Sequence, residues 1–590
     1  MMKRIVAGLF VLMLVALALL LVVPNFIDWN KHKDTLAVHA AAYLQRDVKI
    51  GGDIVLRLLP NPQMSVTDVT VSSIEGAKSP YLLKLKQLEA KVRFKPLLEG
   101  HIEIEKIHLV EPELVLEVLA DGRASWQGLM QGDAARKPFV FGSQGDAITL
   151  EDVTLKGGRI RYVQASSGVD MALEHLNLSV AAPSLRGPYK IVGDMRFRDV
   201  PVNVEATSGL AADQGMPLSV LFQPLEKLPQ LSLKGAIGKN AEGAFYEGDI
   251  VMEQGAPASL FTQEFLTAPV WLQQDMTVNA KLSMRPGELT LSDIEGRSGK
   301  NGKLSGTVSL SRPPMEIPQL SVDMKLEHLP IGGKQDAEPA LPSGMRAKIA
   351  LTAQDALWRG QRIPEIKLSA QSEADFWQVK SLKARLAGKT QFDAEGTVRP
   401  QQQTQSFKVS FSTADMAGFA KTYAAILPPA AAALLPNIPV QDVKLDGNLD
   451  IRPDRVSLYN FNASSGGDGK AGGVVNFANK EMEARLNLSG LSWGEMAAEQ
   501  RAALMTALFA AGNDIDITAG AQRFAETDFN NIVLKAAAAA GDIRIEKFSG
   551  SYGADNTFAL SGNFSSWPPE AADRSEEHTS ELQSPFLISY

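Results

Sequence analysis

The sequence predicts a mainly β protein in which an N-terminal transmembrane helix precedes antiparallel meander repeats with a few inserted helices. Three observations predict this fold. A run of 19 uncharged apolar residues lies near the start of the chain. Most of the remainder alternates apolar and polar residues, which is the period of strands with one apolar face. Glycine, proline and Asp-Gly pairs separate these stretches as turns.

The predicted anchor is the apolar run Ile5 to Val23, which follows Lys3 and Arg4. At 1.5 Å per residue it spans about 28 Å, close to the ~30 Å core of a bilayer. A cleaved signal peptide is the alternative, but it usually ends in a small-x-small site, and none follows this run. The preceding charges place the amino terminus in the cytoplasm and the bulk outside. Phe26 and Trp29 are then expected at the outer interface.

Lys31 to Gln45 is predicted as a short amphipathic helix with Leu36, Ala40, Tyr43 and Leu44 on one face. Its position after the anchor favours the membrane surface or the open end of the first sheet. An ordinary helix packed on that sheet is an equal alternative.

The clearest strands lie between Pro96 and Trp126, with turns at Gly100, Pro112 and Asp121-Gly122. Their alternation slips by one residue at Glu105-Lys106. A bulge or kink there is needed for both halves to share one apolar face. The side chains expected on that face are Ile102, Ile104, Ile107, Leu109, Leu114 and Leu116.

The same slip recurs along the chain, so we expect one structural unit to be reused. In two copies an acidic residue, Asp68 or Asp152, occupies the slip. The copies are Met64-Val66-Val69-Val71, Ile148-Leu150-Val153-Leu155, Leu289-Leu291-Ile294, Val456-Leu458-Phe461 and Ile543-Ile545-Phe548.

Together with Arg46-Asp47-Val48, Gly52 and Leu58-Leu59-Pro60 upstream, the block ending at Trp126 resembles the amino-terminal region of the AsmA family of Gram-negative envelope proteins. The family pattern closes this block with Asn-Trp, where this chain has Ser125-Trp126. The resemblance extends to about residue 564 and is strongest before Trp126 and after Val443.

Beyond this block, Gln131 to Gly145 is polar. Strand-like segments follow in Leu176 to Val180, Ile191 to Phe197 and Val202 to Ala206. The clearest linker of the chain is Gly332 to Gly344. We therefore divide the chain into residues 1–30 with the anchor, 31–135 with the AsmA-like helix and meander, 136–331 as a second β region, the linker 332–344, and 345–570 with AsmA-like β repeats and helical insertions.

The later repeats are marked by pairs of glycines. The pairs are Gly299 with Gly306, Gly388 with Gly396, Gly466 with Gly473 and Gly553 with Gly562, whose second members lie 90, 77 and 89 residues apart. This irregular period indicates related hairpins with insertions rather than a strict solenoid. Two insertions have a helical period: Thr413 to Leu435, broken by Pro428-Pro429, and Ser492 to Ala511, with Met496, Leu504, Leu508 and Phe509 on one face.

The last residues of the chain differ from the rest of the sequence. Arg574 to Ser584 resembles the translation of a sequencing-adapter oligonucleotide, so we expect residues 574–590 to be an artefact. The authentic chain is then expected to diverge from this sequence at about Asp573.

Composition and motifs argue against several classes of function. A net charge of −8 without long basic runs disfavours nucleic acid, and the chain has no cysteine. His32, His39, His101, His108, His175 and His328 form no metal-ligand spacing, and His101 and His108 are expected on the wet face of strands.

Two segments imitate phosphate-binding loops without the context that such a loop needs. Gly467 to Gly472 matches GxGxxG but precedes a strand-like run, which favours a hairpin turn. Gly388-Lys389-Thr390 lacks the first glycine of a P-loop. No feature selects a pair of carboxylates for glycoside hydrolysis. We therefore expect no enzyme, no cofactor and no metal.

Two functions remain. The resemblance implies an inner-membrane-anchored, single-pass periplasmic protein of outer-membrane biogenesis, whose curled sheet forms an apolar β-groove that conducts phospholipid between the inner and outer membranes. The alternative is a non-enzymatic assembly factor with closed β-sandwiches that acts through contacts with outer-membrane assembly proteins. Periodicity alone does not distinguish a groove from a sandwich.

Overall fold

The computed structural model describes residues 28–564, except 58–61, 94–103, 130–149, 166–168, 183–186, 198, 213–214, 227, 241–242, 261–268, 313–316, 333–344, 374, 439, 479–480, 493–497, 511, 525–526, 540–541 and 554–555. This part of the chain is mainly β, as predicted. The predicted anchor, residues 5–23, the tail 574–590 and nearly all of the linker 332–344 lie outside it. No helix within the described residues has the length and apolar character needed to cross a membrane.

The chain divides into two compact units. The amino-terminal unit comprises residues 1–260 and 279–286, and the carboxy-terminal unit comprises residues 261–278 and 287–590. The division falls within strand β14 (Met276–Arg285).

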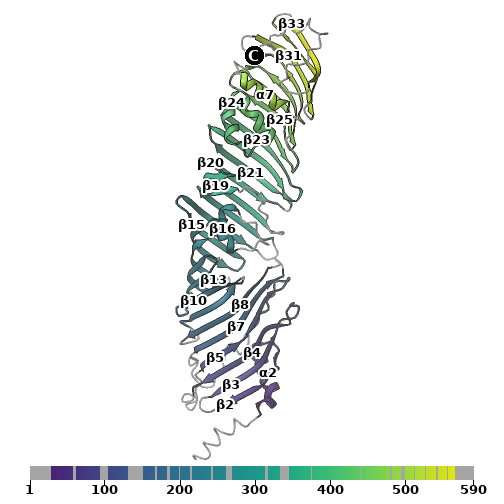
Figure 1. Ribbon diagram of the computed structural model, residues 1–590. Helices are drawn as coiled ribbons and strands as arrows, with labels where there is room; N and C mark the ends of the chain where they lie inside the picture. Colours follow the sequence, from purple (N-terminus) through teal and green to yellow (C-terminus); the bar gives the residue numbers. More distant parts are fainter. Residues whose placement is uncertain are drawn as a thin grey trace, which may run out of the picture. The chain divides into compact units, whose positions relative to one another are not determined.

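The amino-terminal unit begins with two short helices and continues as strands (Figure 1). Its elements are η2 (Trp29–His32), α2 (Lys33–Leu44), β1 (Val48–Ile50), β2 (Ile54–Arg57), β3 (Gln63–Ser72), β4 (Tyr81–Val92), β5 (Ile104–Val110), β6 (Glu113–Val118), β7 (Leu150–Gln164), β8 (Val169–Ala182), β9 (Lys190–Phe197), β10 (Val200–Ser208), β11 (Met216–Pro224), β12 (Gln230–Asn240), β13 (Gly243–Gly255) and η3 (Pro257–Leu260).

These strands pair almost in chain order. Strands β1 and β2 both pair with β3, and β5 and β6 both pair with β4, so each of these pairs acts as one interrupted strand. From β7 to β13 every strand pairs antiparallel with the next. The exception is the step into β7, which runs parallel to both β5 and β6.

The carboxy-terminal unit contains the remaining elements (Figure 1). They are η4 (Val270–Gln273), β15 (Glu288–Ser298), β16 (Gly302–Ser311), β17 (Gln319–Glu327), β18 (Pro330–Gly332), β19 (Arg346–Trp358), β20 (Gln361–Ser372), β21 (Trp377–Leu386), β22 (Thr390–Arg399), η5 (Pro400–Gln402), β23 (Thr404–Asp415), α5 (Met416–Thr422), α6 (Pro429–Leu434), η6 (Leu435–Asn437), β24 (Gln441–Ile451), β25 (Val456–Ser464), β26 (Lys470–Ala478), β27 (Glu481–Ser489), β28 (Leu491–Ser492), α7 (Ala498–Leu508), β29 (Asp514–Ala519), β30 (Gln522–Phe524), β31 (Thr527–Ala539), β32 (Asp542–Tyr552) and β33 (Asn556–Phe564).

Two further parallel steps occur in this unit. Strands β17 and β18 pair parallel with β19, and strands β27 and β28 pair parallel with β29 and β30. The other described pairings of the unit are antiparallel. The sheets are therefore mixed, and the prediction of a purely antiparallel meander is wrong at these steps. A parallel step needs a long crossover instead of a tight turn, which the polar segment, the linker and the helix-bearing insertion provide.

Five of the six predicted slips are β-bulges, with shifted pairing at Glu105, Asp152, Asp293, Asn460 and between Ile545 and Phe548. At the sixth slip, Asp68 has left-handed backbone with a φ of +52°, but β3 and β4 keep one register through it, from Thr67 with Gln87 to Val69 with Leu85. The extra residue lets the apolar residues before and after each bulge share one face.

In the amino-terminal unit residues with left-handed backbone line up across neighbouring strands. Asp68 on β3, Glu111 between β5 and β6, Gly157 on β7 and His175 on β8 all have left-handed backbone, with φ between +47° and +67°. The amide of Glu111 donates to the carbonyl of Lys156 at 2.8 Å. Since positive φ departs from extended backbone, this row bends all of these strands at the same level.

Asp68 offers a test of the left-handed backbone in β3. Replacement by valine should lower the free energy of unfolding by about 1–2 kcal/mol, because a β-branched residue is strained at positive φ. Replacement by glycine should cost less, since glycine has no such strain. Urea unfolding of the full chain measures both. The control is Thr70→Val in the same strand, which should be nearly neutral; equal losses for the two valine variants would refute the assignment.

The glycine pairs lie at the same kind of β-bulge. The second glycines, Gly306, Gly396, Gly473 and Gly562, each lie opposite the residue that borders a bulge in the preceding strand. At Gly306, Gly396 and Gly473 a side chain has no room: a Cβ on Gly306 would lie 2.1 Å from the carbonyl oxygen of Asp323, whereas a Cβ on Gly562 would meet no atom within 4 Å. Each repeat therefore combines a bulged strand with a glycine-bearing strand.

The residues that carry the family resemblance meet near β6. The guanidinium of Arg46 donates to the carbonyls of Ser125 and Gln127. The Ser125 side chain is fully buried, and its hydroxyl accepts from the amide of Glu117 and donates to the carbonyl of Val115. Serine at this position thus joins the loop after β6 to β6 itself.

Glu117 is the second buried polar residue of this region, with 2% of its surface exposed. Its carboxylate accepts from the amide of Lys78 at 2.9 and 3.0 Å and from the amide of Ser79 at 3.2 Å. The carboxylate therefore fixes the loop between β3 and β4 to β6.

Helix α2 contacts β1, and its half-buried face includes Ala40 and Leu44. Leu36 is 39% exposed and Val38 is 67% exposed. The prediction that Leu36 shares the packed face is therefore wrong. Apolar residues lie around most of this helix, so its periodicity does not select one face.

Candidate functional site

The pairing register places apolar side chains of neighbouring strands on one face of the amino-terminal sheet. Paired residues share a face and successive residues alternate. Thus Leu109 on β5 lies beside Leu155 on β7, which lies beside Leu178 on β8. We call this surface the apolar face; it includes Leu88, Ile107, Leu109, Leu155, Leu178, Met195, Val202, Val204, Phe222, Leu231 and Met252.

Side chains on the apolar face pack mainly against one another. Leu176, Met195 and Val202 form a buried cluster, and Leu155, Leu178, Val204 and Phe222 are among the half-buried residues around it. Every described member of this cluster lies in one of the consecutive strands β7 to β11. The side chains that bury the centre of the cluster therefore come from neighbouring strands of the same sheet.

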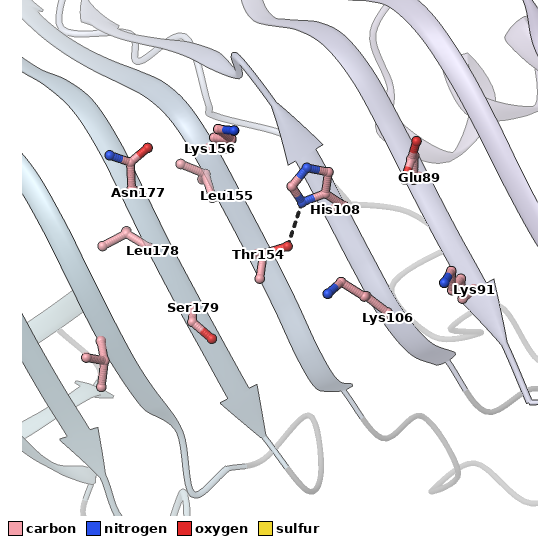
Figure 2. Close-up of a pocket in the computed structure, with 11 residues that line it drawn as sticks. Glu89, Lys91, Lys106, His108, Thr154, Leu155, Lys156, Asn177, Leu178 and Ser179 are labelled. Atoms are coloured by element: carbon pink, nitrogen blue, oxygen red, sulfur yellow. Dashed lines mark hydrogen bonds between the residues drawn. The ribbon is translucent and has the colours of Figure 1, made fainter.

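The opposite face of the same strands is polar. Lys106 and His108 on β5 pair with Asp152 and Thr154 on β7, and Glu89 on β4 lies beside His108. Figure 2 shows this face, where a hollow of about 530 Å³ is bordered by these strands. His108 and Thr154 share a hydrogen bond of 2.6 Å, and Lys106 lies 3.0 Å from Asp152. The side chain of His108 is therefore on the wet face, as predicted.

Exposed ion pairs continue along the polar face. Arg161 donates from Nε to Asp170 at 2.8 Å, and this hydrogen bond holds the pKa of Asp170 below its usual range. Arg159 and Glu174 form a second pair at 2.9 Å. Since all four side chains are more than 40% exposed, these pairs keep the face hydrated and contribute little stability.

The predicted apolar residues are brought to the apolar face as far as they are described. Ile107 and Leu109 belong to it, and Leu114 and Leu116 pair with Ile160 and Tyr162 in continuation of the same surface. Ile102 lies outside the described residues, as do Lys3, Arg4, Ile5, Val23 and Phe26; for Ile104 only the backbone is described, paired with Val92. Trp29 lies in η2 with its ring 6.1 Å from that of His32.

Sequence reasoning missed the larger part of the face. Met195, Val202, Val204 and Phe222 lie in strands β9 to β11 and join the central cluster. Their alternation was visible in the sequence for the segments 191–197 and 202–206. They are connected to Leu109 through the successive pairings of β5 with β7, β7 with β8 and β8 with β9, which no local pattern contains.

The carboxy-terminal unit has an apolar face of its own. Val322 on β17 lies beside Ile349 on β19, and the series continues through Val409 on β23 to Val475 on β26 and Ile515 on β29 by the same rule. Here helices cover part of the face. Leu434 of α6 and Leu508 of α7 pack on a buried cluster of Met482, Ala484 and Ile515.

The two phosphate-loop motifs are hairpin turns. Gly467 to Gly472 covers the turn between β25 and β26 and the start of β26, and Gly388 to Thr390 joins β21 to β22. Among the described residues no group of three or more histidine or carboxylate side chains is placed to hold a metal ion.

Comparison with known proteins gives one match. The family model of the AsmA family matches residues 1–216. No curated protein and no solved structure matches the chain.

Proposed function

We propose, from the premise that this chain is an AsmA family protein, that it binds phospholipid acyl chains along the apolar face and conducts phospholipid between the inner and outer membranes. The protein is then anchored in the inner membrane by residues 5–23, with its amino terminus in the cytoplasm and its sheets in the periplasm. Transfer of an intact lipid forms and breaks no covalent bond, so the proposed role is not enzymatic and needs no cofactor.

One observation carries this proposal. In the amino-terminal unit the apolar face extends from Leu88 on β4 to Met252 on β13, and the described side chains of its central cluster all come from the sheet itself. A large apolar surface without a second layer in its core marks a site for an apolar partner. Acyl chains fit such a surface because they need no hydrogen-bond partner and no fixed register along it.

The energetics agree with a lipid ligand. Burial stabilises an acyl chain by about 0.8 kcal/mol per CH₂ group, so a chain of ordinary length gains on the order of 10 kcal/mol. The charged headgroup would lose hydration if it were buried, so it stays in water at the rim of the face. The contact is therefore strong but not sequence-specific, which allows a lipid to move along the strands.

The closed-sandwich alternative requires a second sheet over the apolar face. The described strands β1 to β13 belong to one series of paired neighbours, and the central cluster of that face contains no described residue from outside β7 to β11. We therefore favour the lipid-binding role.

A photo-crosslinking amino acid tests the proposal at Leu109, with the adjacent His108 as the control on the polar face. In cells labelled with radioactive phosphate, we expect labelled lipid on the protein carrying the probe at position 109 and none at position 108. No adduct at position 109 in folded, membrane-bound protein would contradict the proposal. Equal adducts at both positions would indicate non-specific contact with the membrane.

A further inference from the structure

The apolar face of the carboxy-terminal unit is covered over part of its length by the unit's own helices. We call α5, α6, η6 and α7 the helical cover. Helices α5 and α6 are inserted between the antiparallel neighbours β23 and β24, and α7 forms the crossover between the parallel strands β27 and β29. The two insertions meet, since α7 contacts both α6 and η6.

The strands beneath α7 carry small residues where the amino-terminal unit carries large ones. Ala484, Ala536 and Ala538 lie on the apolar face and are 2%, 3% and 5% exposed. Phe509, directly after α7, packs on Ala536 and Ala538, and Met505 packs on the same cluster. Alanine leaves depth above a sheet that a helix side chain fills, so this part of the face is shaped for the cover.

A buried asparagine fixes the end of α7 to the sheet. Asn513 is 2% exposed, and its Nδ2 donates to the carbonyls of Ala507 and Leu508, both at 2.9 Å. Its Oδ1 accepts from the amide of Met482, the second residue of β27, at 2.8 Å. All polar atoms of this side chain are thus satisfied, which holds α7 in one position.

The upstream end of the cover is fixed in a similar way. The ring of Phe419 in α5 lies 5.0 Å from that of Phe411 and 5.4 Å from that of Tyr423. Phe411 belongs to the apolar face of the carboxy-terminal unit. Tyr423 is fully buried; its hydroxyl donates to the carbonyl of Arg362 and accepts from the amide of Ala387. These contacts tie α5 to β20 and to the end of β21.

We propose that the helical cover closes the apolar face beneath it to apolar ligands, so that acyl chains are held on the open strands and not on β27 to β32. The inference rests on the proposed lipid function for the identity of the ligand. The closure itself rests on packing alone. The cover occupies the surface that acyl chains occupy elsewhere, and lipid must therefore enter or leave upstream of it.

Because the chain has no cysteine, single cysteines report on closure directly. Ala484→Cys and Ala536→Cys place a thiol beneath the cover, and Val204→Cys places one on the open, half-buried face of the amino-terminal unit. The probe is a pyrene-bearing maleimide applied to the folded full chain. We expect modification at positions 484 and 536 to be at least about a hundredfold slower than at position 204, because it requires local opening.

A second measurement on the unaltered chain uses vesicles that contain a phospholipid with a photoreactive diazirine in one acyl chain. Adducts mapped by proteolysis should lie on strands of the open face and be absent from residues 514–519 and 531–539. Adducts in these two segments, or modification of position 484 at the rate of position 204, would overturn the closure. Slow modification beneath the cover with no lipid adduct anywhere would support closure and refute the lipid function.

A variant that opens the cover completes the test. Adding Asn513→Ala to Ala484→Cys removes the hydrogen bonds that hold the end of α7, and modification at position 484 should accelerate by about tenfold or more. The rate at position 204 should stay unchanged in the same background. An unchanged rate at position 484 would show that Asn513 does not hold the cover closed.

Discussion

Replacing Phe222 by glutamate should abolish phospholipid adducts on the amino-terminal unit while the sheet remains folded. Phe222 is half-buried at the edge of the cluster formed by Leu176, Met195 and Val202. A carboxylate at this position stays hydrated in the free protein but would be desolvated beneath an acyl chain. The resulting cost of several kcal/mol corresponds to a loss of about a hundredfold or more in lipid occupancy.

The matched control is Gln223→Glu, which adds the same charge one residue later, on the exposed polar face. Labelled lipid per molecule of purified protein is compared for the two variants, with circular dichroism and resistance to protease as the measures of folding. Unchanged lipid on folded Phe222→Glu protein would remove the apolar face of β11 from the lipid site. Loss of lipid in both variants would point to net charge rather than to the apolar face.

The second large effect is expected for Glu117→Ala. The substitution leaves the part-buried amides of Lys78 and Ser79 without their acceptor, and it leaves a cavity beside β6 where the buried Glu117 side chain lay. An unsatisfied buried amide costs about 1–3 kcal/mol, so the free energy of unfolding of this region should fall by about 2 kcal/mol. Glu117→Gln keeps one acceptor oxygen and should lose less.

Hydrogen exchange at residues 78 and 79 reports this loss locally, which avoids treating the whole chain as one cooperative unit. Glu75→Ala removes an exposed carboxylate from the same loop and serves as the control. Exchange should accelerate in Glu117→Ala and not in Glu75→Ala. Equal protection in all three proteins would show that the carboxylate does not hold the loop.

Local features of the fold could be predicted from the sequence because their causes are local. An extra residue between two alternating runs requires a bulge if both runs share a face, and the bulge at Asp293 is confirmed by its φ of +49° and by the shifted pairing. The glycine at 306 is explained by the same bulge, since it lies opposite Ile294. The helical periods of the two insertions likewise led to α5, α6 and α7.

The parallel steps were not predicted, because strand direction is set by the connection and not by the strand. The pairing of Leu109 with Leu155 depends on a crossover of polar sequence that carries no period of its own. For the same reason the extent of the apolar face beyond Leu116 was missed. The inserted helices were predicted, but their position on the apolar face of the carboxy-terminal unit was not. That position depends on the alanines at 484, 536 and 538, which come together on one face only when their strands are paired.

Pairing between nearest neighbours has a consequence for how such a sheet changes in evolution. Within each unit the described strands exchange main-chain hydrogen bonds with adjacent strands, so stability is close to a sum of neighbour terms along one dimension. An antiparallel hairpin can then be gained or lost without rebuilding the strands on either side. Residues 200–224, which form β10 and β11, are such a hairpin. The length of the sheet is in this sense a heritable variable, adjustable in steps of two strands.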